Sequence, residues 1–417
     1  MVQHPEYSLI HGDCRKVLNQ LDENCLDALC TDAPYGLGFM NKNWDKEVPG
    51  PDYWKTVLRV LKPGAHGLVM GGTRTFHRLI CAIEDSGFEF IDTLMWLYSS
   101  GFPKSHNAAM LIDKHFGHKN RGRAIPTAST YQASDKEQKN KLESNPVGEY
   151  EPIEEAAKEW NGYGTKLKPA YEPIFLIRKP MKGTISQTVL EHRTGVLNID
   201  GCRIGYEPVT INRFTDGAKP FGNGAGHEYQ STQVKGRFPA NVCHDGSDEV
   251  LELFPYTKSG TLTGNKTFSG FLPGTNYENQ KERTLMHRKG DEGSAARFFF
   301  CSKASKKEKE FGLENFMPKQ VTDGRHKTAD NAYQRGASMR KNTHPTVKPI
   351  KLGQWLSRLI CPKGGTILDM FAGSGSFGIS AILEGFNWIG IENDEEGFKI
   401  AEARMKAWNE IIRNTTK

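Results

Sequence analysis

A carboxylate, a proline and an aromatic ring follow a mostly apolar segment near the start of this 417-residue chain. The four residues are Asp32-Ala33-Pro34-Tyr35. Asp32 can accept a hydrogen bond from an amine, and the carbonyl of Ala33 can accept a second one because Pro34 keeps Ala33 extended. Tyr35 offers a ring face on which a planar base can stack. Two acceptors on one amine localise its nitrogen lone pair, so the segment could prepare the amine of a flat heterocycle for reaction.

A second segment, near the other end of the chain, is typical of a nucleotide-like cofactor site. An apolar strand runs into a glycine-rich turn, and a helix is expected from about Phe377. The turn spells G-x-G-x-x-G with Gly373, Gly375 and Gly378. Glu392 ends the next apolar strand, where a carboxylate can accept from ribose hydroxyls. Only 25 residues follow Glu392, too few to complete a NAD domain. A different nucleotide-like cofactor is therefore favoured over NAD, and over a glycine turn that binds nothing.

The elements that must position these segments alternate between strand and helix. Strands are expected at 7–10, 26–31, 67–70, 88–98 and 171–177, and helices at 14–21, 52–61, 76–85 and 350–360. We expect Pro63-Gly64 to stop the second of these helices. Such alternation predicts an α/β fold, a doubly wound and mostly parallel sheet with ligands at the carboxyl ends of its strands. Because so little chain follows Glu392, strands from both ends of the chain must build the sheet.

The chain between these ends is expected to be an insertion. We divide it into a first core part (1–102), an inserted polar and partly flexible loop (103–160), a core strand (161–180), an irregular α+β lobe (181–336) and a second core part (337–417). The lobe is glycine-rich, with poor helical periodicity and basic residues interleaved with Tyr and Phe.

Charge and cysteine content bear on whether the protein binds phosphates or a metal. The net charge is +6, but residues 296–351 hold 13 Lys or Arg against 5 Asp or Glu, a concentration that suits phosphate binding or a solvated loop face. The eight cysteines show no C-x-x-C spacing, and a metal at Cys202, Cys243, His244 and Cys301 matches no zinc pattern, so no metal is expected. Without a signal peptide or spanning segment, we expect a cytoplasmic protein that contacts no membrane.

Three motifs, in this order, resemble one enzyme family. Asp32-Ala33-Pro34-Tyr35 resembles the D-P-P-Y signature of amino-group DNA methyltransferases, His344–Pro349 resembles their H-P-T-x-K-P segment, and Phe371–Gly375 resembles their F-x-G-x-G cofactor motif. The order is similar to the β class, and residues 36–45, 168–174 and 236–241 resemble phage and prophage members. The resemblance implies a circularly permuted methyltransferase fold of the S-adenosylmethionine-dependent type, with S-adenosylhomocysteine as product. Ala33 departs from the family pattern, which has proline there, and this change loosens the loop.

The resemblance also implies roles for particular residues. Asp32, Ala33, Pro34 and Tyr35 would form the reactive site; Asp13, Thr346, Lys348, Asp369, Phe371, Gly373, Gly375 and Glu392 would bind the cofactor. Two of these roles have alternatives, because Lys348 could contact a phosphate and Asp369 could cap a turn. Double-stranded DNA is the implied substrate, with the target nucleotide flipped out of the duplex. Candidate DNA contacts are Arg213, Arg237, Arg297, Lys303, Lys306, Lys307, Arg335 and Arg340, each of which could also be a solvated surface charge.

The favoured reaction is methylation of adenine at N6, because aspartate heads the first motif. Cytosine N4 methylation, RNA base methylation and a catalytically weak DNA-binding relative are the alternatives. The resemblance is compatible with a homodimer and with a cognate restriction enzyme. The location would be the nucleoid of a bacterium or of a phage-infected host.

Overall fold

The computed structural model describes residues 4–38, 45–101, 105–118, 150–214, 229–260, 291–302, 305–320, 339–344 and 346–415. Within these ranges it describes the side chains except those of residues 206–214, 229–231, 306, 320 and 415.

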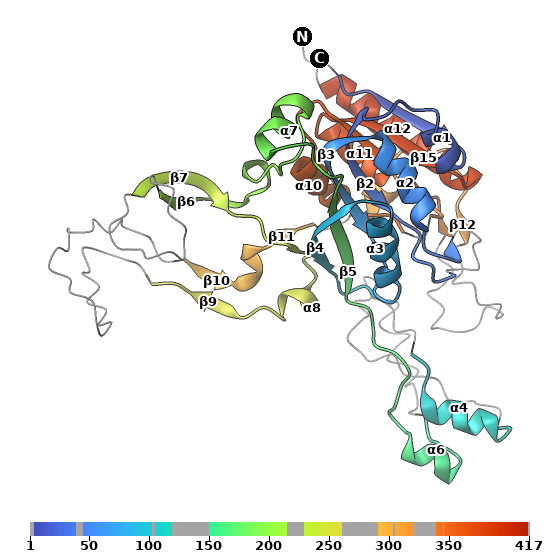
Figure 1. Cartoon of the computed structure of the whole chain (residues 1–417). Coiled ribbons are helices and arrows are strands. Elements are labelled where there is room, and N and C mark those ends of the chain that lie inside the picture. The colour runs from blue at the N-terminus through green and yellow to red at the C-terminus, as the bar shows by residue number, and fades with distance from the viewer. Residues whose placement is uncertain are drawn as a thin grey trace.

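A nine-stranded sheet forms the centre of the protein, in the order β1-β15-β14-β2-β3-β5-β4-β8-β11 (Figure 1). Its strands are β1 (Tyr7–His11), β2 (Leu26–Asp32), β3 (Leu61–Met70), β4 (Glu89–Leu97), β5 (Tyr171–Arg178), β8 (Val242–His244), β11 (Phe300–Cys301), β14 (Thr366–Asp369) and β15 (Asn387–Glu392). All neighbours pair in parallel except at β5, which runs antiparallel to both β3 and β4. This arrangement confirms the predicted mostly parallel sheet.

Helices cover both faces of the sheet. The elements α1 (Cys14–Leu18), α2 (Pro51–Val60) and α3 (Phe76–Asp85) pack on one face, and α10 (Ile350–Ile360), α11 (Ser376–Leu383) and α12 (Glu395–Thr415) pack on the other. Side chains of a strand alternate between faces. In β2, accordingly, Leu29 packs in the apolar cluster on the face covered by α1, α2 and α3, while Ala28 and Cys30 pack in the cluster on the opposite face. A strand buried on both faces reads as a continuous apolar run, which is why β2 and β14 were predictable.

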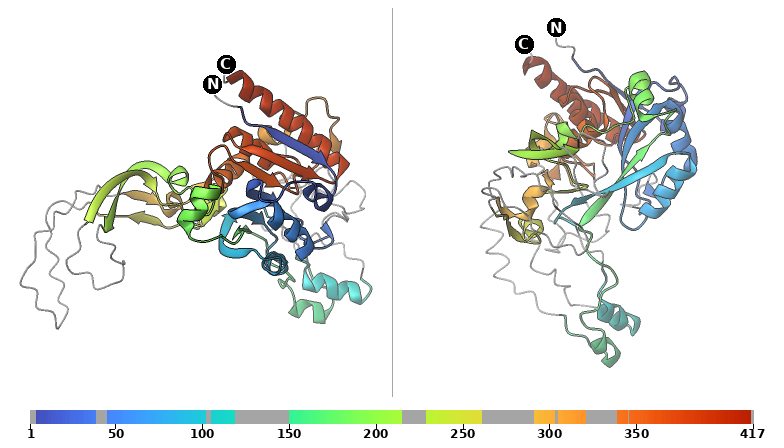
Figure 2. Two further views of the ribbon diagram at one scale, coloured as in Figure 1. Left: turned by 45° about the horizontal axis from the view of Figure 1, so that its top comes forward. Right: turned by 60° about the vertical axis from the view of Figure 1, so that its left-hand side comes forward.

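The two ends of the chain meet in the sheet, as expected. Strand β1 pairs with β15, and β2 pairs with β14, so the motif segment and the glycine-rich segment lie on adjacent strands. Figure 2 shows β1 beside α12, the first strand next to the last helix. The doubly wound, circularly permuted fold class predicted from the sequence is therefore confirmed.

One expected boundary is wrong. Strand β3 begins at Leu61, six residues before the predicted start, so Pro63-Gly64 lies inside the strand and does not itself stop α2, which ends at Val60. Leu61, directly after α2, already has an extended backbone. Lys62 is then kept out of the helical conformation because it precedes Pro63. Leu61 then pairs with Leu26, across an irregularity in the β2–β3 register.

The middle of the chain is not wholly separate from the sheet. Two short strands from the expected lobe, β8 and β11, extend the sheet beyond β4, and α7 (Ile185–His192) packs against β3. An open strand edge offers unpaired N–H and C=O groups, and two- or three-residue strands can satisfy them without a recognisable sequence pattern. The remaining elements are β6 (Ile204–Phe214), β7 (Tyr229–Arg237), α8 (Asp248–Leu251), β9 (Tyr256–Lys258), β10 (Glu292–Ser294), α9 (Lys306–Glu310), β12 (Lys319–Gln320) and β13 (Met339–Arg340), with 3-10 turns at Asp200–Cys202 and Ala295–Phe298.

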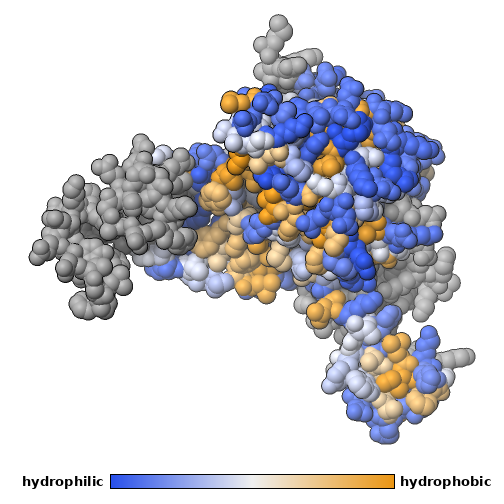
Figure 3. All heavy atoms as spheres, viewed as in Figure 1, coloured by the Kyte–Doolittle hydropathy of each residue, from blue (hydrophilic) through white to orange (hydrophobic). Residues whose placement is uncertain are grey.

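Two parts of the insertion project from the core. The β6–β7 hairpin extends to one side of the sheet, and α4 (Ala108–His115) with α6 (Glu155–Glu159) projects below it (Figure 1). The helical projection carries the exposed side chains Leu111, Phe116, Ile153 and Trp160. Figure 3 shows orange, hydrophobic spheres gathered on this projection. The expected polar loop at 103–160 thus contains a packed helical pair, although residues 119–149 lie outside the described ranges.

Across the described ranges, no helix is long and apolar enough to cross a bilayer. Those ranges also contain no cluster of three or more His, Cys, Asp or Glu side chains arranged to hold a metal ion.

Candidate active site

The two segments singled out in the sequence open onto one cavity. A hollow of about 1770 Å³ lies at the carboxyl ends of the central parallel strands. Its lining includes Asp32–Tyr35 from the end of β2, Phe371–Ser374 from the turn after β14, and Asp13 and Glu392 from the ends of β1 and β15. Ligand sites in such sheets form where these strand ends meet, so the topology itself brings the residues together.

A carboxylate holds the loop that carries the reactive motif. Asp45 accepts hydrogen bonds from the backbone N–H groups of Tyr35 at 2.8 Å, Gly36 at 2.9 Å and Leu37 at 3.3 Å. Gly36 has a φ of 64°, a left-handed conformation that glycine adopts without strain. The hydroxyl of Thr75 donates to the carbonyl of Tyr35 at 2.5 Å. These contacts offset the stiffness lost where Ala33 replaces the family's proline.

The side chains of the motif form a charged network with two residues distant in sequence. The hydroxyl of Tyr35 donates to Asp32 Oδ1 at 3.0 Å. The ammonium of Lys348 lies 2.7 Å from Asp32 Oδ2 and 3.2 Å from Glu172 Oε2. Lys348 comes from the segment before α10, and Glu172 comes from β5. Sequence reasoning placed Lys348 on the cofactor or a phosphate; its observed contacts are with the reactive carboxylate.

Burial and charge shift the pKa values in this network. Burial raises the pKa of Glu172, and Lys348 only partly offsets that effect. Burial alone would lower the pKa of Lys348, but Asp32 and Glu172 outweigh it and hold the pKa above its usual value. Burial and the neighbouring Asp32 carboxylate raise the pKa of Tyr35 well above its ordinary range. At neutral pH the lysine is therefore a cation and the tyrosine a neutral donor.

The glycine turn is shaped by backbone conformation and close packing. Gly373 and Gly375 have φ values of 54° and 74°, both in the left-handed region. A Cβ added at Gly373 would lie 2.8 Å from Cε1 of His344, so no other residue fits without a shift. The N–H of Gly373 donates to Glu392 Oε2 at 2.6 Å, and the N–H of Asp394 donates to Oε1 at 2.7 Å. Glu392 thus fixes the turn, while a carboxylate keeps acceptor capacity for a ligand.

The side chains of Arg404 and His344 both contact this turn. The guanidinium of Arg404, on α12, donates to the hydroxyls of Ser374 at 3.0 Å and Ser376 at 3.2 Å, and also bonds the Ser374 carbonyl. His344 lines the cavity and packs against Gly373, and desolvation there lowers its pKa to about 4, so the ring is neutral at pH 7. Neither Arg404 nor His344 was singled out as a site residue from the sequence, although His344 heads one of the motifs.

Asp369 links the two motif strands. The hydroxyl of Thr31, on β2, donates to Asp369 Oδ1 at 2.7 Å, and the N–H of Phe371 donates to the same oxygen at 3.3 Å. No described residue donates to Oδ2. Burial raises the pKa of this carboxyl to about 7. Asp369 thus caps the turn, as the alternative considered from the sequence proposed, and its second carboxylate oxygen has no hydrogen-bond donor among the described residues.

Three further expected cofactor residues line the same cavity. Asp13 caps the N-terminus of α1 by accepting from Arg15 N at 2.9 Å, and its carboxylate pairs with the Arg15 guanidinium. Thr346 and Phe371 also line the hollow, and the ring of Phe371 packs on Tyr53 with 6.3 Å between centroids. Their contacts with a cofactor stay a prediction.

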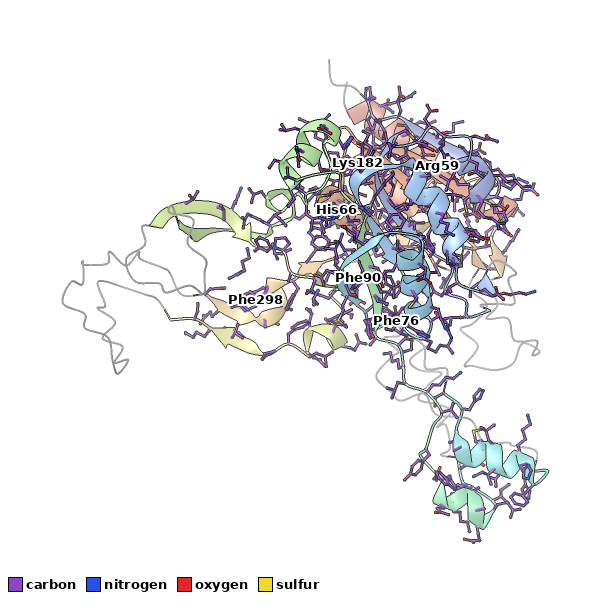
Figure 4. All side chains as sticks on the ribbon, viewed as in Figure 1. Arg59, His66, Phe76, Phe90, Lys182 and Phe298 are labelled. Carbon is purple, nitrogen blue, oxygen red and sulfur yellow. The ribbon has the colours of Figure 1, made fainter. Side chains whose placement is uncertain are left out.

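The predicted DNA contacts differ in exposure and in their partners. Arg237 and Arg297 both pair with Asp291 and both lie over the ring of Phe298, at 4.6 and 4.2 Å from its centroid. Phe298 lies between the β6–β7 hairpin and the sheet in Figure 4. Lys307, on α9, and Arg340, on β13, are exposed. Lys303, Arg335 and the side chains of Arg213 and Lys306 lie outside the described part of the chain.

A comparison of the sequence with protein families gives a match that is consistent with the cavity, the motifs and the sheet. Residues 26–403 match the N6/N4 methyltransferase family of DNA methylases. The chain belongs to this family. The match covers both motif segments and all of the insertion, so the resemblance noted in the sequence is confirmed.

Individual relatives match shorter stretches. The chain is 37% identical over 78 residues to the type II methyltransferase M.BglI of Bacillus subtilis, covering 18% of this chain and 22% of the relative. It is 39% identical over 77 residues to M2.MboI of Moraxella bovis, covering 18% and 27%. M.HindIII of Haemophilus influenzae is 24% identical over 226 residues, covering 43% and 61%. The chain thus spans less than two thirds of the length of these curated relatives.

Solved structures cover nearly the whole chain but superpose on it with low TM-scores. An M1.HpyAVI complex with S-adenosylmethionine superposes with a TM-score of 0.37 at 12% identity, covering 96% of this chain and 98% of the other. The cytosine-N4-specific PvuII DNA methyltransferase superposes with a TM-score of 0.40 at 13% identity, covering 99% and 96%. The assignment of the fold rests on the sheet described above and on the family match.

Proposed function

We propose that this protein transfers a methyl group from S-adenosylmethionine to the N6 amine of a flipped-out adenine in double-stranded DNA. One observation carries the proposal: Asp32 and the glycine turn at Phe371–Ser374 open onto the same cavity, after adjacent parallel strands. Membership of the N6/N4 family supports an amino group as the acceptor. Aspartate at position 32 favours adenine over cytosine, a distinction that family membership leaves open.

The residues of the cavity fit S-adenosylmethionine, which when bound supplies a methyl group from a sulfonium and leaves as S-adenosylhomocysteine. The turn at Gly373 has no room for a Cβ, so backbone can approach a ligand closely there. Asp13 and Glu392 line the hollow at the ends of β1 and β15, where they would hold the adenosine. Asp369 lies behind the cavity lining, so its part in cofactor binding would be indirect, through the hydrogen bond that fixes Phe371. Thr346 and Phe371 complete the proposed cofactor surface, and Gly375, outside the lining, would act by shaping the turn with its left-handed backbone.

The protein's own part in the reaction is to hold and polarise the amine. The carboxylate of Asp32 accepts one amine N–H and the carbonyl of Ala33 accepts the other, which pulls the nitrogen toward tetrahedral geometry. Pro34 keeps that carbonyl extended, and Tyr35 stacks on the base. As the nitrogen becomes positively charged, the carboxylate stabilises it and takes the proton that leaves. Positioning and electrostatic stabilisation of this kind typically supply most of an enzyme's rate enhancement.

Duplex binding is the second part of the proposal. The insertion at 181–336, with its projecting hairpin, would read the target sequence, and the two chain ends would form the catalytic core. The exposed Lys307 and Arg340 and the remaining basic candidates of 296–351 would contact phosphates and offset the cost of flipping, which is roughly a few kcal/mol. A homodimer and a restriction partner stay predictions from family resemblance.

The test is transfer of a radiolabelled methyl group to duplex DNA, followed by digestion to nucleosides. We expect label in N6-methyl-2′-deoxyadenosine, lost in Asp32→Ala but retained in Asp22→Ala, an exposed aspartate outside the cavity. Circular dichroism must show both variants folded. Label in N4-methylcytosine would correct the base, label only in RNA would correct the polymer, and no transfer to any substrate by the wild type would contradict the proposal.

A further inference from the structure

The reactive end of the cavity contains one cation between two carboxylates. Lys348 Nζ is 2.7 Å from Asp32 Oδ2 and 3.2 Å from Glu172 Oε2. The side chains of Lys348, Asp32 and Glu172 are 5%, 14% and 18% exposed, so water screens these charges weakly. With Tyr35 neutral and both carboxylates ionised, the group carries a net charge of −1. Where the cation lies within it decides how much negative charge Asp32 presents to a ligand.

In the observed arrangement Lys348 lies closer to Asp32 than to Glu172, a position that opposes catalysis. Asp32 Oδ1 already accepts from Tyr35, and Oδ2 accepts from Lys348. An ammonium at 2.7 Å from Asp32 repels the positive charge that grows on an amine nitrogen as it is methylated. It also occupies Asp32 Oδ2, while Oδ1 is taken by Tyr35, so an amine N–H must compete with one of these donors. The lysine therefore competes with the target amine for the same carboxylate.

Glu172 provides a second position for the lysine within reach. It lies on β5, a central strand, where it pairs in register with Trp96 of β4, so its backbone is fixed. No described residue makes a well-directed hydrogen bond to Oε2, which faces Lys348 at 3.2 Å. A small movement of the flexible lysine stem would shorten that contact and lengthen the contact with Asp32. The charge of Lys348 would remain paired throughout, avoiding the cost of an isolated buried ion.

We propose that Glu172 is a positioning residue that draws Lys348 away from Asp32 when the target base enters the cavity. The inference rests on the proposed function and deepens it. Lys348 holds the reactive carboxylate in place before the base arrives, and Glu172 then takes the cation so that Asp32 can accept from the amine. The net charge of −1 that remains favours the positive nitrogen that forms during transfer.

The experiment compares Glu172→Gln, Lys348→Met and the double variant with the wild type, on a duplex containing the methylated site mapped for the wild-type protein. Glu172→Gln leaves Lys348 with Asp32 as its sole carboxylate. We expect kcat to fall about 10- to 100-fold, the size typical of losing one stabilising group, while KM for duplex stays within about three-fold. The double variant has no competing cation, so its kcat should exceed that of Glu172→Gln. Binding of S-adenosylmethionine, measured by calorimetry, should change little in all three variants.

Glu384→Gln is the matched control. Glu384 is also a largely buried carboxylate in an ion pair, with Arg358, but it lies outside the cavity lining. Its variant should keep wild-type kcat. An unchanged kcat in Glu172→Gln, or a double variant no faster than Glu172→Gln, would overturn the proposal. A loss of S-adenosylmethionine binding in Lys348→Met would place the ammonium on the cofactor and overturn it as well. Failure of the proposed function itself would be evident earlier, as the absence of any methylated site in the wild type.

Discussion

The carboxylate of Asp45 accepts a hydrogen bond from the backbone N–H of Tyr35 at 2.8 Å, ten residues back along the chain. The same oxygen accepts from Gly36, and the other accepts from Leu37. Asp45 is 2% exposed. The position of the reactive loop therefore depends on one buried side chain outside the motif itself.

Asp45→Asn should lower both activity and stability. The amide keeps one acceptor oxygen but presents an NH₂ group to a backbone N–H, so at least one donor loses its partner. Such a loss costs about 1–3 kcal/mol, and a loosened motif should lower kcat about 10-fold or more. Urea unfolding and methyl transfer to DNA measure the two effects. Asp52→Asn, on an 89% exposed side chain in the first turn of α2, should leave both close to wild type.

Gly373→Ala should weaken cofactor binding through a local clash. Its Cβ would lie 2.8 Å from the His344 ring, and the φ of 54° adds roughly 1–2 kcal/mol for any residue with a Cβ. Gly385→Ala is the matched control, because Gly385 has a φ of 81° and open space around its Cβ position. Both variants should lose stability through the backbone strain, and Gly373→Ala should lose more because of the added clash. Calorimetry should show weaker binding of S-adenosylmethionine in Gly373→Ala alone; equal binding in both would disconnect the turn from the cofactor.

Much of this framework was predictable from the sequence because it depends on local patterns. Buried parallel strands such as β14 are short apolar runs, and α10 has apolar residues at helical spacing. The motif segments were recognisable for the same reason: each is contiguous. Two strands of the sheet, β8 and β11, were not predicted because they are three and two residues long and form by pairing with an existing edge.

Side-chain partners were not predictable, because they join residues far apart in the chain. Lys348 and Asp32 are separated by 316 residues, and nothing near either one identifies the other. Glu172 was visible only as part of a resemblance, and its role depends on lying beside Lys348. The basic residues show the same limit, since composition could not indicate that Arg237 and Arg297 share Asp291 as a partner.

The stability of the protein should depend on Asp369 with a definite sign. Its pKa is about 7 in the folded protein, against an ordinary value of 3.8. Between these values the folded state binds the extra proton, so this carboxyl destabilises the fold as the pH rises from about 4 to 7. Relative to Asp369→Asn, the wild type should lose about 1 kcal/mol of unfolding free energy per pH unit over that range. Urea unfolding at several pH values measures the difference.

His344 gives a comparison of opposite sign. Its pKa is lowered to about 4 in the folded protein, so the unfolded state binds the extra proton between about 4 and 6.5. Relative to His344→Gln, the wild type should therefore gain stability as the pH rises through this range. A difference that is independent of pH for either variant would contradict the burial that the structure gives the corresponding group.

Salt dependence should separate the basic residues that contact DNA from those that support the fold. Lys307 and Arg340 are exposed, whereas the guanidinium of Arg237 is engaged by Asp291 and Phe298. If the first two meet phosphates, Lys307→Gln and Arg340→Gln should each reduce the slope of log binding constant against log salt by about 1. Arg237→Gln should leave the slope unchanged and lower the free energy of unfolding, because it removes half of a shared ion pair. Binding to one duplex, titrated at several salt concentrations, measures all three slopes. A reduced slope in Arg237→Gln would show that DNA displaces Asp291 from this arginine.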